Sequence, residues 1–221
     1  KAYARAMRDS IPDGHAAVTP MFTASRTEPM HTTHYSVVDA QGNAVATTTT
    51  LNSLYGSGVY VAGAGFFLND EMDDFASQPG TANQFGLVQG EANAIAPGKR
   101  MLSAMSPTIV VDRTGKPLLV VGAAGGPTII TATTQVILNV IDNDMSLSDA
   151  MKAPRLHEQA WPDVLVYEHD GLSPAVADSL KAMGYRLHEI PHLANANAVM
   201  RDARGWAGMV EPRSSGGAVG Y

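Results

Sequence analysis

Three copies of one turn pattern constrain the fold of this chain more than any other feature. In each copy an apolar run ends in aspartate, glycine follows three residues later, and a second apolar run begins, within residues 34–47, 107–121 and 198–210. This pattern is typical of a type I turn whose glycine takes the left-handed conformation beside a bulge. Because such turns join antiparallel strands, the sequence predicts antiparallel sheet and argues against a parallel, doubly wound one.

Helices are predicted between these hairpins. Ser146 should cap a helix that runs towards Ala153, and Ser173-Pro174 should begin one that ends at Gly184. A short helix over residues 1–9 and a longer one over residues 127–141 are also expected. The residues predicted on the buried face of the longer helix are Ile130, Ile137, Leu138 and Ile141. Hairpins and helices in separate blocks favour an α+β fold built in layers.

Composition excludes several classes of function. The formal net charge of the 221 residues is −6 and no basic run occurs, so nucleic acid and an anionic membrane are not expected as partners. The absence of cysteine excludes thiol catalysis, disulfides and cysteine-ligated zinc. The seven histidines show no metal-ligand spacing, so no metal or cofactor is predicted, and His34 is assigned a structural role. Residues 118–141 are uncharged and long enough to span a bilayer, but Gly125-Gly126-Pro127 interrupts them, which favours a strand, a turn and a helix.

Two threonines stand between two histidines where the first hairpin begins, after a proline-dotted linker. If Asp39 pairs with Asn43 across the turn, Thr32 faces Thr50. Threonine suits a strand start, so a purely structural role is one interpretation. The other is a nucleophile, which needs a base to take its proton. The α-amino group of Thr32 itself, with a pKa near 8, would serve if the peptide bond after His31 were cut.

Five motifs then resemble, in order and spacing, the small subunit of gamma-glutamyltranspeptidases. They are T-T-H-Y-S-V-V-D at 32–39, T-L-N at 50–52, L-N-D-E-M-D-D-F at 68–75, L-S-A-M-S-P-T-I-V at 102–110 and G-A-A-G-G at 122–126. The resemblance covers residues 32–221, while residues 1–31 resemble the C-terminal tail of the large subunit. It implies an N-terminal-nucleophile hydrolase with a four-layer αββα sandwich of mainly antiparallel sheets.

The resemblance also implies a reaction. The precursor would cut itself between His31 and Thr32, and the freed Thr32 would attack the γ-glutamyl amide of glutathione or a related donor. The glutamyl group would then pass to water, an amino acid or a dipeptide, with Thr50 supporting the nucleophile. The large subunit of the same precursor is the expected partner, because in this family it supplies an arginine for the substrate α-carboxylate. A periplasmic or secreted location is expected on the same ground.

Further site residues follow from the resemblance. Asn52, Glu71 and Asp74 match residues that hold the substrate α-amino group, and carboxylates suit an ammonium ion. From the residues alone, an exposed acidic loop is the favoured interpretation of D-E-M-D-D, and the resemblance is what favours the pocket. Ser103 matches a serine that binds the α-carboxylate, and Phe85 lies in a lid over residues 79–87. Gly125 and Gly126 match the pair whose backbone N–H groups form the oxyanion hole, although a plain turn is the alternative.

Three positions depart from the family pattern. Ala104 stands where many members carry a second serine, Phe85 where some carry tyrosine, and Ala123-Ala124 where serine-proline is common. These differences bear on donor preference and on the balance between hydrolysis and transfer. Two other functions therefore stay open: a related N-terminal-threonine acylase, acting on cephalosporins or poly-γ-glutamate, and an uncut fragment that only binds γ-glutamyl compounds.

Overall fold

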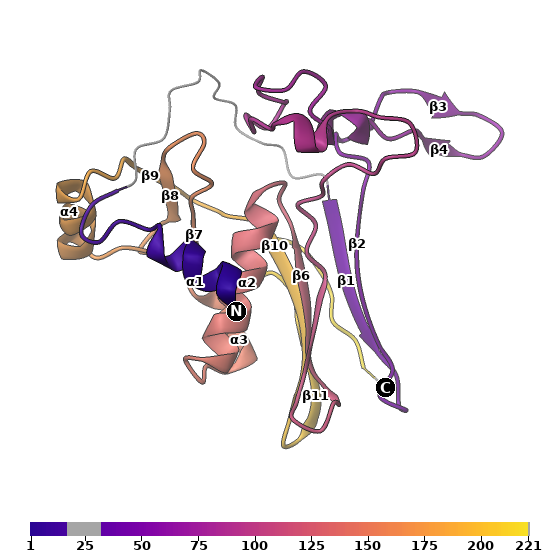
Figure 1. The fold of residues 1–221 in the computed structure, drawn as a ribbon. Coiled ribbons are helices and arrows are strands. Elements are labelled where there is room, and N and C mark those ends of the chain that lie inside the picture. Colours follow the sequence, from indigo (N-terminus) through magenta and orange to yellow (C-terminus); the bar gives the residue numbers. More distant parts are fainter. Residues whose placement is uncertain (17–31, 221) are drawn as a thin grey trace.

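The computed structural model of the protein describes residues 1–16 and 32–220 (Figure 1). His31 and most of the predicted linker lie outside the described residues. A central antiparallel sheet has the strand order β11-β10-β6-β5. Its strands are β5 (Thr108–Val111), β6 (Pro117–Ala124), β10 (Asn195–Asp202) and β11 (Gly205–Met209).

The three predicted hairpins are all present. β1 (Thr32–Val38) pairs with β2 (Ala44–Thr50), and β5 with β6 and β10 with β11 form the other two. In the first turn Asp39 N donates to Asn43 O at 3.0 Å, as the turn pattern predicted. The glycine that closes each turn has a positive φ, +85° at Gly42, +82° at Gly115 and +123° at Gly205. Local turn chemistry therefore sets the register of each pair of strands.

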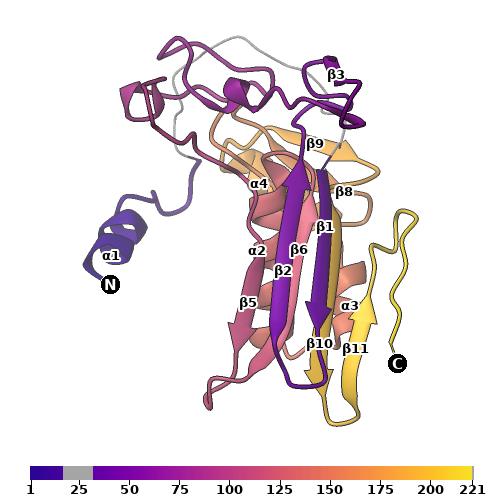
Figure 2. The same cartoon turned by 90° about the vertical axis from the view of Figure 1, so that its right-hand side faces the viewer.

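The described residues form three layers. Helices α2 (Thr128–Ile141) and α3 (Leu147–Lys152) cover one face of the central sheet, and the β1–β2 hairpin lies on the other face (Figures 1 and 2). The hydrophobic core lies between the helices and the sheet. It includes the buried residues Leu119, Val121, Ile129, Val136, Met151 and Ala196. This helix–sheet–sheet order positions the start of β1 and the start of α2 at the same end of the molecule.

The prediction of which face of α2 is buried was wrong. Ile130, Leu138 and Ile141 are 49%, 44% and 42% exposed, and Ile137 is only partly buried. The residues that face the core are instead Ile129, Ala132, Thr133, Val136 and Val140. A helix that packs closely on a sheet needs small side chains where the backbones approach, so the face with alanine and threonine turns inward and the bulkier face turns outward.

The other predicted helices are confirmed. The Oγ atoms of Ser146 and Ser173 accept from the backbone N–H groups of Asp149 and Val176, so they cap α3 and α4 (Pro174–Ala182). α1 spans Ala2–Asp9. α4 lies beside a small sheet of β7 (Leu156–His157), β8 (Leu165–Glu168) and β9 (Leu187–Ile190), in which β8 and β9 are parallel. The fold is thus mainly, but not entirely, antiparallel.

A buried histidine fixes the β1–β2 hairpin on the central sheet. His34 bonds through Nδ1 to Thr48 Oγ1 at 2.8 Å and through Nε2 to Ser36 Oγ at 3.0 Å. Ser36 Oγ in turn donates to Val120 O in β6 at 3.1 Å. Burial lowers the pKa of His34 to about 4, so the ring is neutral at pH 7. A Cβ atom at Gly122 would overlap the imidazole ring, which requires glycine there. His34 is structural, and it holds the strand that begins with Thr32.

Loops form a roof over one end of the sheets. The roof, residues 51–104, contains the short strands β3 (Tyr60–Val61) and β4 (Phe66–Phe67) and the 3-10 turns η1 (Glu71–Asp74) and η2 (Glu91–Asn93). The β3–β4 loop projects away from the layers (Figure 1). Among the described residues, none of the helices is both long and apolar enough to span a bilayer.

Candidate active site

Thr32 and Thr50 face each other at the end of the β1–β2 hairpin, in the register that the sequence predicted. Thr32 Oγ1 donates to Thr50 Oγ1 at 3.2 Å, and Thr50 Oγ1 also accepts from the backbone N–H of Asn52 at 2.9 Å. Within residues 1–16 and 32–220, neither a histidine nor a carboxylate bonds to the Thr32 hydroxyl. Thr50 can therefore orient the Thr32 hydroxyl, but a base that activated this hydroxyl would have to come from elsewhere.

A pocket opens beside this hydroxyl pair, under the roof. Its lining residues are Thr32, Thr50, Asn52, Asp74, Phe85, Leu87, Gln89, Leu102, Ser103, Ala104, Met105, Gly126, Pro127 and Ile129. Seven of the predicted site residues thus meet in one cavity, although they come from widely separated parts of the chain. Two predicted residues, Glu71 and Gly125, do not line it. Each is close to a residue that lines the pocket. Glu71 is in the same turn as Asp74, and Gly125 directly precedes Gly126.

The acidic end of the pocket is rich in carboxylates without a cation. Burial, together with the neighbouring carboxylates of Glu71, Asp73 and Asp70, raises the pKa of Asp74 to about 6. Burial and Asp70 likewise raise the pKa of Glu71. None of the ion pairs among the described residues involves these four side chains. A cation placed here would relieve that repulsion and hold Asp74 in its charged form.

Asp70 holds the turn that carries Asn52, a role that was not predicted from the sequence. Its carboxylate accepts from Ser53 N at 3.0 Å and from Ser53 Oγ at 2.6 Å. Asn52 Nδ2 donates to Asp70 O at 3.3 Å, and Asn52 itself has a φ of +74°, a left-handed conformation that asparagine tolerates better than most residues. The acidic motif gave a signal for charge here, but nothing in the spacing linked it to Ser53.

The two glycines before α2 have positive φ angles, and at Gly125 a side chain would also clash with its neighbours. Gly125 has a φ of +146° and Gly126 one of +54°. A Cβ atom on Gly125 would lie 2.5 Å from Thr128 Oγ1 and 3.0 Å from Ala194 Cα. Since they precede a helix N-terminus beside Thr32, their backbone is suited to stabilise negative charge that develops next to the nucleophile.

A buried charge network lies behind these glycines. Arg155 and Glu211, each 2% exposed, form an ion pair of 2.7 Å, and Arg155 Nη1 also donates to Leu193 O and Ala194 O at 3.0 and 3.2 Å. Arg213 bridges Glu168 at 2.7 Å and Glu211 at 2.9 Å. The network therefore holds the residue, Ala194, against which Gly125 packs.

The positions that depart from the family pattern lie in or beside the pocket. Ala104 and Phe85 line the pocket, so one hydroxyl is missing from each of two walls. Ala123 and Ala124 are buried at the end of β6, directly before the glycines. In the described part of the chain, no group of three or more histidine, aspartate or glutamate side chains is arranged to hold a metal ion.

Comparison with known proteins agrees with this geometry. The family model for Gamma-glutamyltranspeptidase matches residues 1–221. A Glutathione hydrolase proenzyme from Pseudomonas aeruginosa is 50% identical over 193 residues, which cover 86% of this chain and 34% of that protein. One from Escherichia coli is 42% identical over 218 residues, covering 97% of this chain and 37% of that protein. The chain thus spans about a third of the length of these relatives.

A solved structure shares the fold. The Gamma-glutamyltranspeptidase from Pseudomonas nitroreducens, complexed with L-DON, is 48% identical and superposes with a TM-score of 0.78, covering 86% of this chain and 99% of that chain. The layered, mainly antiparallel architecture is that of the N-terminal-nucleophile hydrolases. The chain belongs to the gamma-glutamyltranspeptidase family.

Proposed function

We propose that this chain is the catalytic part of a γ-glutamyl hydrolase and transferase that cleaves glutathione and related γ-glutamyl amides. The observation that carries the proposal is the paired hydroxyls of Thr32 and Thr50 in the same pocket as the uncompensated carboxylate of Asp74. A γ-glutamyl donor presents an amide carbonyl at one end and an ammonium group at the other. These two features of the pocket complement both ends of such a donor.

The reaction begins once the bond between His31 and Thr32 has been cut. The α-amino group of Thr32 takes the proton from Oγ1 as Oγ1 bonds to the γ-carbonyl carbon. The backbone N–H groups of Gly125 and Gly126 stabilise the oxyanion. The C–N bond then breaks, the departing amine takes the proton, and a γ-glutamyl ester of Thr32 remains. Water or an acceptor amine attacks this ester and regenerates the hydroxyl.

The other predicted residues hold the donor. Asp74 and Asn52 bind its α-ammonium group, and Ser103 contributes to binding of its α-carboxylate. Glu71 acts from outside the pocket wall, by adding negative charge beside Asp74. Phe85 covers the donor through apolar contact, without a hydroxyl to donate.

We further propose that residues 1–31 are the tail of a large subunit and its linker, and that residues 32–221 are the small subunit. Two observations support this division. The curated relatives are named proenzymes. The P. nitroreducens chain is covered almost completely by 86% of this chain, about the share that residues 32–221 represent.

An exposed apolar surface supports a large subunit as the partner. Tyr35, Val37 and Val45, on the outer face of the β1–β2 hairpin, are about half exposed, as are Tyr60 and Phe66 of the projecting β3–β4 loop. Hairpin face and loop lie on the same side of the molecule (Figure 1). Large apolar patches of this kind mark interaction sites. We propose that the rest of the precursor covers this surface and supplies the outer helical layer. The proposed location is the periplasm or the cell exterior, as expected for the family.

The test compares two donors with the complete two-subunit protein. We expect γ-glutamyl-p-nitroanilide to be turned over with a kcat/KM at least about 100-fold higher than glutaryl-p-nitroanilide, because the glutaryl group lacks the ammonium and leaves Asp74 unpaired. Equal kcat/KM values would favour the acylase alternative. Binding of glutathione in a calorimeter, without release of glutamate, would favour the non-catalytic one.

The raised pKa of Asp74 predicts how donor binding depends on pH. Below pH 6 Asp74 becomes protonated and loses the charge that attracts an ammonium group. The inhibition constant of L-glutamate should therefore be flat above about pH 7, bend near pH 6 and rise about tenfold per pH unit well below it. An Asp74→Asn variant should bind glutamate more weakly at pH 7 and show no bend near pH 6. An unchanged bend in that variant would assign the titration to another group.

A further inference from the structure

One side chain outside the pocket connects the segments that form two of its walls. Asn93, at the end of η2, donates from Nδ2 to Asp74 O at 2.6 Å and to Gln89 Oε1. Its Oδ1 accepts from Leu102 N at 2.9 Å, next to Ser103. Its backbone O also accepts from Ala76 N at 3.0 Å. Asn93 thus bonds to three segments of the roof, at Asp74 and Ala76, at Gln89 and at Leu102.

These segments carry the groups proposed for the two charged ends of the donor. Asp74 is the proposed partner of the α-ammonium group and Ser103 that of the α-carboxylate. In the roof, η1 and η2 are single 3-10 turns, and Ala76 and Ala94 form one isolated bridge between them. Regular secondary structure therefore does not fix the separation of Asp74 and Ser103. The amide of Asn93 bonds to the backbone of both walls.

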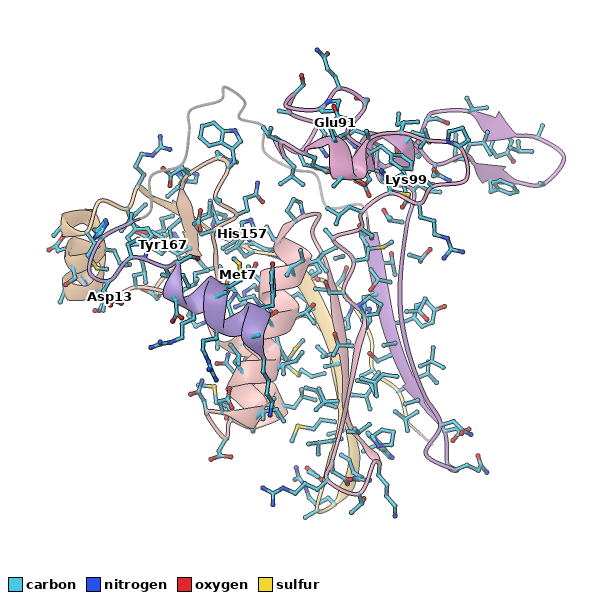
Figure 3. The ribbon with its side chains drawn as sticks, in the orientation of Figure 1. Met7, Asp13, Glu91, Lys99, His157 and Tyr167 are labelled. Carbon is cyan, nitrogen blue, oxygen red and sulfur yellow. The ribbon has the colours of Figure 1, made fainter. Side chains whose placement is uncertain are left out.

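The amide group is the chemistry that this position requires. It is at once a donor towards Asp74 O and Gln89 Oε1 and an acceptor from Leu102 N, a combination that neither aspartate nor leucine offers. The side chain is half-buried and does not line the pocket. Figure 3 labels two other residues of the roof, Glu91 at the start of η2 and Lys99. Lys99 Nζ donates to Ala94 O at 2.9 Å, directly after η2.

We propose that Asn93 is a positioning residue that sets the separation between the α-ammonium and α-carboxylate binding groups and so selects an α-amino acid head group. The proposal rests on the proposed function. Asn93 touches neither Thr32 nor Thr50, so its effect falls on binding of the donor and not on the nucleophile.

The experiment uses the two-subunit protein with Asn93→Ala and Asn93→Asp, and with Asn143→Ala as a control. On the exposed surface, the side chain of Asn143 donates to Asn139 Oδ1 at 3.2 Å and its backbone N–H donates to Leu138 O at 3.1 Å. We expect Asn93→Ala to be cut normally before Thr32 and to raise the KM for γ-glutamyl-p-nitroanilide about 10- to 100-fold, with kcat changed less than about threefold. Asn93→Asp keeps the acceptor for Leu102 N but loses both donors, so it should give a similar rise without a change in side-chain volume.

A second donor separates positioning from general damage. Turnover of glutaryl-p-nitroanilide, which has no ammonium group to place, should change less than about threefold in the same variants. An unchanged KM for the γ-glutamyl donor, or an equal loss for both donors, would overturn the role of Asn93. If Asn93→Ala fails to fold, Asn93→Asp carries the same test. A wild-type protein that does not turn over the γ-glutamyl donor would overturn the proposed function itself, and with it this proposal.

Discussion

Replacing Thr32 with alanine in the full precursor is expected to give a single uncut chain with no measurable γ-glutamyl turnover. The variant lacks the hydroxyl that we propose attacks both the preceding peptide bond and the donor amide, so both steps should fail together. The loss of kcat should be about 10⁴-fold or more, as is found when the nucleophile of a hydrolase is removed. Intact mass under denaturing conditions measures the cut, and release of p-nitroaniline measures turnover.

Two matched variants make this result specific. Thr33→Ala removes an exposed neighbouring hydroxyl that points to the opposite face of the hairpin, and it should be cut and active. Thr32→Ser keeps the hydroxyl and should be cut, at a reduced rate. A Thr32→Ala chain that still splits before residue 32 would show that another group performs the cleavage and would remove the support for an N-terminal nucleophile.

Breaking the buried ion pair between Arg155 and Glu211 should cost the most stability. Burial disfavours the charged form of both groups. It lowers the pKa of Arg155. In Glu211 the attraction of Arg155 and the hydrogen bonds that the carboxylate accepts outweigh burial, so its pKa is lowered. Glu211→Ala leaves Arg155 buried without its partner, so the free energy of unfolding should fall by about 3–5 kcal/mol. Urea unfolding of the two-subunit protein measures it.

A double replacement distinguishes the effect of the unpaired charge on stability from that of lost side-chain packing. Arg155→Met with Glu211→Leu removes both charges together and should recover most of the lost stability, since no unpaired charge remains. Activity should recover less, because Arg155 also holds the carbonyl groups of Leu193 and Ala194 beneath Gly125. A double variant as unstable as Glu211→Ala alone would mean that packing, and not the unpaired charge, accounts for the loss.

The parts of this fold that depend on local chemistry could be predicted from the sequence. The Asp39–Gly42 turn determines its own geometry, so it fixed the opposition of Thr32 and Thr50 across a whole hairpin. The caps at Ser146 and Ser173 are equally local. The buried face of α2 was not predictable in this way, because the periodicity of large residues offers two faces and the partner sheet decides between them.

The missed site residues depend on contacts between loops. Asp70 meets Ser53 and Asn93 meets Asp74, pairs separated by 17 and 19 residues with no repeating pattern between them. A single polar residue in a loop gives no sign of which distant backbone atom it will bond. Thr32 and the acidic motif stood out in the sequence as parts of motifs, whereas the contacts of Asp70 and Asn93 became visible only in the fold.

The buried contact of His34 has a consequence for the moment of self-cleavage. A newly cut chain end is normally the part of a protein most prone to fray. Here the new end would be the proposed nucleophile, Thr32. Two residues further along the chain, His34 bonds to Thr48 and Ser36, and Ser36 bonds to the carbonyl of Val120. The strand is anchored independently of the bond that is broken. The proposed cut would therefore free the amino group of Thr32 without releasing its hydroxyl from Thr50, so the geometry of the proposed nucleophile would be in place before cleavage.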